Sequence, residues 1–126
     1  MRYNLLIITA LLGALTIVLG AFGAHALKDV LTDPLLKSLE TAVRYQMYHV
    51  LVLLFVNTTD IITESFKNKI SYALLAGILL FSGSIYAITL AQVPAKTIWF
   101  MTPLGGLCFI IGWILLLYSF VKAKKA

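Results

Sequence analysis

The chain has 126 residues, of which 61% are hydrophobic and only 12% are charged, and its mean hydropathy is +0.98. A soluble domain carries charge on about a quarter of its residues, so this composition excludes a water-soluble fold and predicts a membrane protein. The formal net charge of +5 comes from scattered basic residues, which excludes a nucleic-acid-binding surface. A single cysteine, Cys108, excludes an intramolecular disulfide and a cysteine-cluster metal site.

Four apolar blocks follow one another along the chain, separated by short polar intervals. Each block is near the length of about 20 residues with which a helix crosses the hydrocarbon of a bilayer. Short connections make successive helices antiparallel neighbours, so we expect an all-α, integral membrane four-helix bundle with antiparallel up-down topology. We expect one domain over residues 1–126, with helices at residues 4–27, 38–57, 70–92 and 98–121.

Two of the predicted helices begin at a capping residue. Asn4 is placed to cap the first helix. Thr102 followed by Pro103 is typical of an N-cap with proline at the first helical position, where the missing N–H costs nothing. In the alternative interpretation, the fourth helix begins at Thr97 and is kinked at Pro103.

The first apolar block also has the small-x-small ending of a signal-peptidase site at Ala24-His25-Ala26. A cleaved signal has an apolar core of about 7 to 15 residues and a clearly basic start. Here the apolar stretch over residues 5–22 is longer, and Arg2 is the only charge before it. We therefore expect the first helix to be retained.

Lysines and arginines are unevenly distributed between the two sides of a four-span arrangement. Six lie on the side of the two termini: Arg2, Lys67, Lys69, Lys122, Lys124 and Lys125. Four lie on the other side: Lys28, Lys37, Arg44 and Lys96. Basic residues accumulate on the cytoplasmic side of membrane proteins, so we expect both termini in the cytoplasm.

Small residues recur at helical spacing in the apolar blocks, where they allow two helix backbones to approach closely. The predicted packing residues are Gly20, Ala24, Ala73, Gly77, Gly83, Ala87, Gly105 and Gly112. They serve either as contacts between helices of one chain or as contacts with a second copy or another membrane protein.

The second block carries the most informative polar residues. On a helix turning by about 100° per residue, its polar groups share an arc of about 180° that runs from Glu40 through Arg44 to His49. Glu40 precedes Arg44 by four residues, the favourable order for an ion pair on a helix. Because His25 ends the preceding helix on the same side of the membrane, the sequence predicts a buried polar cluster of His25, Glu40, Arg44, Tyr45 and His49.

Ionisable groups inside a membrane are costly, which makes a functional role the first hypothesis for this cluster. It predicts binding or transfer of a small polar ligand or a proton. In the plainer interpretation, Glu40 and Arg44 stabilise the bundle edge while His25 and the tyrosines anchor it at the interface. A third interpretation is a structural or partner-binding subunit that assembles through the small residues.

The remaining chemistry-bearing residues predict no enzyme. No nucleophile lies at a suitable spacing from a base, and no nucleotide-binding loop is present in the sequence. His25 and His49 have no close-spaced third ligand, whereas a catalytic zinc requires three, so we expect no metal site. No motif indicates haem or another cofactor.

Four motifs occur in order along the chain: residues 20–28 (GAFGAHALK), 41–49 (TAVRYQMYH), 81–86 (FSGSIY), and 102–106 (TPLGG) with Gly112 and Trp113. In these motifs the sequence resembles the YgdD/YwdK-like family of small bacterial inner-membrane proteins, a domain-of-unknown-function family with animal relatives. The resemblance covers nearly the whole chain and implies a four-helix, multi-pass protein of the bacterial inner membrane. It implies no substrate and no catalytic residue.

Overall fold

The computed structural model describes residues 2–126, and every regular element in that range is a helix, as the sequence predicts. The elements are α1 (Arg2–His25), α2 (Asp33–Thr58), α3 (Glu64–Gly77), the π-helix η1 (Ile78–Ser82), α4 (Gly83–Thr89), α5 (Ala95–Ile98) and α6 (Met101–Lys125). Because α3, η1 and α4 follow one another without interruption, they form one continuous rod, and the described chain therefore has four long rods.

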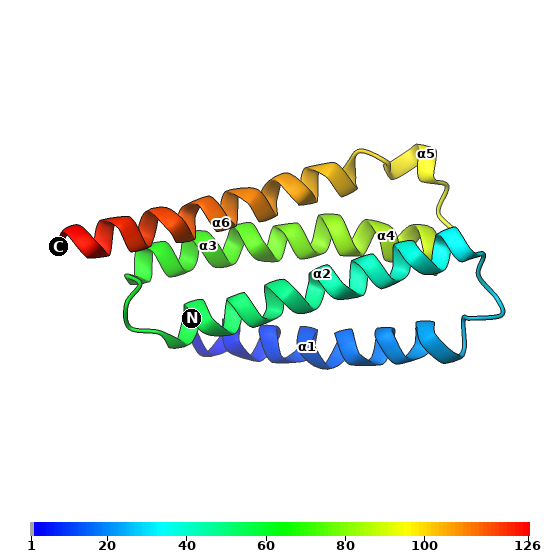
Figure 1. Ribbon diagram of the computed structural model, residues 1–126, viewed down its shortest axis with the longest axis horizontal. Coiled ribbons are helices and arrows are strands. Elements are labelled where there is room, and N and C mark those ends of the chain that lie inside the picture. Colours follow the sequence, from blue (N-terminus) through cyan, green and yellow to red (C-terminus); the bar gives the residue numbers. More distant parts are fainter. Residues whose placement is uncertain (1) are drawn as a thin grey trace.

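The four rods lie side by side in the order α1, α2, α3 with α4, and α6 (Figure 1). Both ends of the chain and the connection over residues 59–63 lie at one end of the rods, and residues 26–32 and 90–100 connect the rods at the other end. α1 packs on α2, and α6 packs on α3 and η1. α2 contacts α1, α3, η1 and α4, so it occupies a central position.

Three of the rods are long and apolar enough to cross a membrane: α1, the rod Glu64–Thr89, and α6. Large apolar side chains cover their outer surfaces; Leu11 is 65% exposed and Leu117 is 64% exposed. Such a large apolar surface is unfavourable in water but favourable in the hydrocarbon of a bilayer. α2 is long enough but falls outside this set because its first half is rich in charged and polar residues.

The second and third long helices begin earlier than the sequence predicts. α2 begins at Asp33 rather than at residue 38, with Thr32 extended before it and Pro34 in its first turn. α3 begins at Glu64 rather than at residue 70, after the extended Thr63. The apolar blocks mark the hydrocarbon-length part of each helix, whereas acidic residues and proline favour the polar first turn that precedes it.

The start of α6 matches neither of the two interpretations of the fourth block. The interruption lies at Trp99 and Phe100, between α5 and α6, so Pro103 falls in the first turn of α6. Thr102 does not cap the helix, because its hydroxyl hydrogen-bonds the hydroxyl of Ser84 in α4 at 2.6 Å. Likewise α1 begins at Arg2, ahead of the predicted cap at Asn4.

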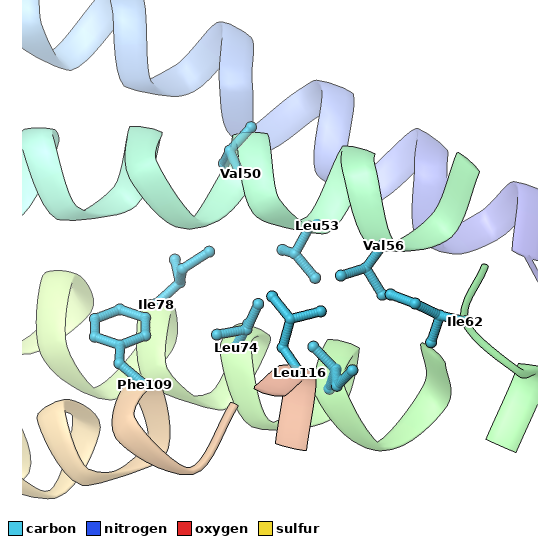
Figure 2. Close-up of a cluster of buried hydrophobic side chains, with 9 residues drawn as sticks. Val50, Leu53, Val56, Ile62, Leu74, Ile78, Phe109 and Leu116 are labelled. Atoms are coloured by element: carbon cyan, nitrogen blue, oxygen red, sulfur yellow. The ribbon is translucent and has the colours of Figure 1, made fainter. Parts of the chain in front are cut away.

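The hydrophobic core lies between α2, the α3–η1 segment and α6 (Figure 2). Its buried members are Val50, Leu53, Val56, Ile62, Ile70, Leu74, Ile78, Phe109 and Leu116. α1 contributes only the partly buried Leu12 to the edge of this cluster. The core therefore depends on three rods, with α1 packed on the outside of α2.

Glycines allow α6 to approach the α3–η1 segment closely. A Cβ atom added to Gly105 would overlap the backbone of Phe81, and one added to Gly77 would overlap the ring of Phe109. In η1 the helix widens, because the N–H of Gly83 donates to the carbonyl of Ile78 five residues earlier. The predicted packing residues Gly77 and Gly105 thus lie at a contact within the chain.

Candidate functional site

Gln46 of α2 links three helices. Its side chain is 1% exposed, and its Nε2 donates to the carbonyl of Leu12 in α1 at 3.0 Å. Its Oε1 accepts a hydrogen bond from the hydroxyl of Tyr86 in α4 at 2.7 Å. At about 100° per residue Gln46 lies on the side of α2 away from Arg44, outside the polar arc considered in the sequence.

Further hydrogen bonds connect α2 with the third rod. Ser82 of η1 donates to the carbonyl of Ala42 at 2.7 Å, and Asn57 donates to the hydroxyl of Ser71 in α3 at 2.8 Å. Within residues 2–126, every buried side-chain nitrogen and oxygen has a hydrogen-bond partner. The buried polar side chains on the inward face of α2 are therefore all paired, and their signal in the sequence is a polar residue in the interior of an apolar helix.

His49 joins α2 to α6. Its Nδ1 lies 2.6 Å from the Tyr45 carbonyl, and its Nε2 accepts a hydrogen bond from the Trp113 indole at 3.2 Å. These partners imply the neutral form with the proton on Nδ1. The ring stacks on Phe109 with centroids 3.6 Å apart and planes inclined by 4°. Both ring nitrogens are thus engaged within the protein.

A groove of about 300 Å³ runs between α1 and α2 near the end that carries residues 26–32. Its lining residues are Leu19, Gly20, Gly23, Ala24, Leu36, Leu39, Glu40, Val43 and Arg44. Gly23 faces Leu39, because an added Cβ would lie 2.9 Å from Leu39 Cδ2. The floor of this groove is apolar, and its charged groups are Glu40 and Arg44.

The structure brings together only part of the predicted polar cluster. Glu40, Arg44 and Tyr45 are exposed, and His49 alone is buried. His25 is exposed at the end of α1 and is not among the residues that line the groove. Glu40 and Arg44 share the groove but form no ion pair; the ion pairs within residues 2–126 are Arg2–Glu64 and Lys67–Glu64.

The expectation of a buried cluster is therefore wrong for His25, Glu40, Arg44 and Tyr45. The spacing places the last three on one arc of α2, but it does not determine which arc faces the core. α1 packs beside this arc instead of covering it, so the charges remain accessible in the groove. No group of three or more His, Cys, Asp or Glu side chains lies together in the part of the chain that the structure describes.

A second groove, of about 750 Å³, lies between α2 and α6. Its lining residues are Tyr45, Tyr48, His49, Pro103, Gly106, Leu107, Phe109, Ile110 and Trp113. Tyr45 stacks on Phe81 with ring centroids 4.8 Å apart, so its ring is held by the third rod. The sequence predicted no groove here, because α2 and α6 are far apart along the chain.

The family profile described as "Protein of unknown function (DUF423)" matches residues 19–106. This chain belongs to that family. It is 40% identical to a UPF0382 membrane protein of Haemophilus influenzae over 99% of both chains. It is also 37% identical to the UPF0382 membrane protein YwdK of Bacillus subtilis, over 93% of this chain and 95% of the relative.

A third relative, the UPF0382 membrane protein of Staphylococcus aureus strain bovine RF122, is 40% identical over 93% of this chain and 94% of its own length. No solved structure matches the chain. The resemblance seen in the four sequence motifs is confirmed, and the chain is a DUF423 membrane protein; the three relatives named here are bacterial.

Proposed function

We propose that the four rods form an antiparallel bundle in the bacterial inner membrane, with α2 as a fourth crossing helix. α2 has 26 residues and extends over about 39 Å at 1.5 Å per residue, more than the hydrocarbon thickness of about 30 Å. Its inward polar groups are paired with neighbouring helices, which removes most of their cost in lipid. The excess of basic residues near both termini favours their cytoplasmic location.

Within this bundle, the protein binds a phospholipid headgroup in the groove between α1 and α2. The carrying observation is that Glu40 and Arg44 line one groove, are both exposed, and form no ion pair with each other. An arginine side chain binds phosphate through two parallel hydrogen bonds, and a carboxylate binds an ammonium group. The pair therefore matches a headgroup that carries both phosphate and amine.

The depth of the two charges supports a lipid rather than a water-soluble ligand. Glu40 lies about 10 Å and Arg44 about 16 Å from the start of α2 at 1.5 Å per residue. Arg44 extends toward the surface to reach the interface, where lipid phosphates lie. The apolar floor beside the charges provides a surface for the first carbons of an acyl chain.

Two other functions have less support. Proton transfer through His49 would require breaking one of its two hydrogen bonds or its stack on Phe109. Self-association through the small residues competes with their contacts inside the chain, since Gly105 faces Phe81 and Gly112 faces Leu74.

The test compares lipid binding by Glu40→Gln, Arg44→Gln and the unaltered protein, purified and studied by native mass spectrometry. For phosphatidylethanolamine, which carries amine and phosphate, we expect each substitution to weaken binding about tenfold or more, the loss typical of a charge-assisted hydrogen bond. For phosphatidylglycerol, which lacks the amine, only Arg44→Gln should weaken binding. Lys28→Ala is the matched control, because Lys28 is basic, exposed and at the same end of the rods.

Equal binding of both lipids by all variants would refute the headgroup site. Soluble glycerophosphoethanolamine, added as a competitor, distinguishes a site for the headgroup alone from one that also requires the acyl chains. Circular dichroism of each variant verifies that the helices are retained, so that lost binding is not lost folding.

A further inference from the structure

The groove between α2 and α6 has walls that are predominantly aromatic and firmly held. Tyr45 stacks on Phe81, and the imidazole of His49 stacks on Phe109 at 3.6 Å. Trp113 meets the His49 ring edge-on, with ring centroids 6.4 Å apart and an interplanar angle of 74°. The groove volume of about 750 Å³ lies within the range of roughly 300 to 1,000 Å³ found for sites that bind small organic molecules.

Among the side chains that line this groove, two hydrogen-bond donors have no partner in the described chain. The Trp113 indole nitrogen donates a hydrogen bond to Nε2 of His49, and Nδ1 of His49 is hydrogen-bonded to the Tyr45 carbonyl. The hydroxyls of Tyr45 and Tyr48 make no hydrogen bond within residues 2–126, although both residues line the groove. Each is a donor without an acceptor of its own.

These two hydroxyl-bearing residues lie near the middle of α2, which the proposed arrangement places in the membrane. Tyr45 is about 18 Å and Tyr48 about 22 Å from the start of α2, which is about 39 Å long at 1.5 Å per residue. Both residues lie further from the start of α2 than Arg44 does, and acyl chains beside them offer no hydrogen-bond acceptor. A lipid-soluble molecule that carries polar oxygens would supply an acceptor for these donors.

We propose that this groove binds a lipid-soluble quinone, a flat ring with carbonyl oxygens and an apolar tail. The ring stacks against the aromatic walls, as offset aromatic pairs do. Its carbonyl oxygens accept hydrogen bonds from Tyr45 and Tyr48, and its tail follows Leu107 and Ile110 of α6 toward the lipid. This site is separate from the groove of Glu40 and Arg44; it rests on the proposed membrane crossing of α2 and not on the headgroup proposal.

Gly106 provides a way to block the groove without disturbing the fold. It lines the groove, and a Cβ added there meets nothing within 4 Å, so Gly106→Leu fills the groove and leaves the helix contacts unchanged. Gly83→Leu is the matched control. Gly83 also lies in a helix with its nearest neighbour 3.9 Å from an added Cβ, but it lines a different groove, with Ala87 and Met101.

The experiment uses the full chain with Trp99→Phe, so that Trp113 is the only tryptophan, in phosphatidylcholine vesicles. Decylubiquinone, a benzoquinone with a ten-carbon tail, is added, and quenching of Trp113 fluorescence is followed. We expect a saturable component of quenching above the linear component that comes from quinone dissolved in the bilayer. Gly106→Leu should weaken the saturable component at least tenfold, and Gly83→Leu should leave it unchanged.

The double substitution Tyr45→Phe with Tyr48→Phe tests the hydrogen bonds separately from the ring walls. It keeps both rings and removes both hydroxyls, so we expect apparent affinity to fall about fivefold or more. Quenching that is linear in the unaltered chain, or equally saturable in Gly106→Leu, would overturn the proposal. So would a crosslink to a second protein, formed in bacterial membranes by Tyr48→Cys in a Cys108→Ser background, that persists when decylubiquinone is added.

Discussion

At the scale of single residues, α2 has polar side chains on two faces with opposite properties. Gln46, His49 and Asn57 point inward and are paired with other helices. Glu40 and Arg44 are exposed and line a groove. Hydrogen bonds between membrane helices contribute about 0.6 kcal/mol on average and at most about 1.7 kcal/mol. The inward face therefore stabilises a particular arrangement of helices, and the outward face leaves Glu40 and Arg44 accessible in the groove.

A double-mutant cycle on Gln46 and Tyr86 tests the inward face. Gln46→Leu removes the acceptor of the Tyr86 hydroxyl, and Tyr86→Phe removes the donor. We expect each single substitution to lower the free energy of unfolding by about 1 to 3 kcal/mol, because it leaves a buried polar group unpaired. The double variant should lose less than the sum, with a coupling of about 1 kcal/mol.

The free energies of unfolding of the four proteins in this cycle are measured by titrating each protein, in detergent, with dodecyl sulfate. Strictly additive losses would contradict the hydrogen bond as an energetic link between α2 and α4. Ser38→Ala serves as the control, because the Ser38 hydroxyl is exposed and bonds only within its own helix.

At the scale of elements, the contact between α6 and the third rod distinguishes two adjacent glycines. Gly105 faces the backbone of Phe81 in η1, whereas Gly106 faces an open groove. The widened turn of η1 and the absence of a side chain at Gly105 together allow the two backbones to come close. The sequence Gly105-Gly106 alone does not indicate which of the two glycines the close helix contact requires.

We therefore expect opposite effects from two neighbouring alanine substitutions. Gly105→Ala should lower the free energy of unfolding by about 1 to 3 kcal/mol or more, because the added methyl group overlaps backbone that has no room to move. Gly106→Ala should be neutral or stabilising by up to about 1 kcal/mol, since alanine is a better helix former. Thermal unfolding of both variants in the same detergent measures the difference, and equal stabilities would contradict the close contact at Gly105.

At the scale of the whole molecule, charge is distributed unevenly between the two ends. Arg2 and Lys67 pair with the single carboxylate of Glu64 at the end that carries both termini, and Lys67 is 2% exposed. Lys122 lies over the ring of Phe66 at the same end. This end keeps an excess of positive charge, which favours the cytoplasmic side of the membrane.

Cysteine labelling tests whether α2 crosses the membrane. In a Cys108→Ser background, Asp29→Cys and Asp60→Cys place one thiol before and one after α2, both at exposed positions. We expect a membrane-impermeant maleimide to label the first variant in intact bacterial spheroplasts and the second only after lysis. Labelling of both thiols from the same side would contradict four crossings.

Much of the fold followed from hydropathy, and part of the candidate site did not. The apolar blocks located all four rods, because an apolar stretch of this length hides its peptide groups from lipid only as a helix. The early starts at Asp33 and Glu64 were missed because polar first turns lie outside the hydrophobic signal. The widened turn η1 was missed because no local pattern of residues in that stretch distinguishes it from an α-helix.

Sequence alone determined the helical class and the polar arc of α2, since these depend on composition and on spacing along one helix, and the resemblance in four ordered motifs indicated the family. Only the tertiary structure decided which way that arc faces. It placed Gln46 and His49 among other helices, left Glu40 and Arg44 in a groove, and formed a second groove from α2 and α6. Helix periodicity sets the angles between side chains on one rod, but the rotation of the rod is set by the packing of its neighbours.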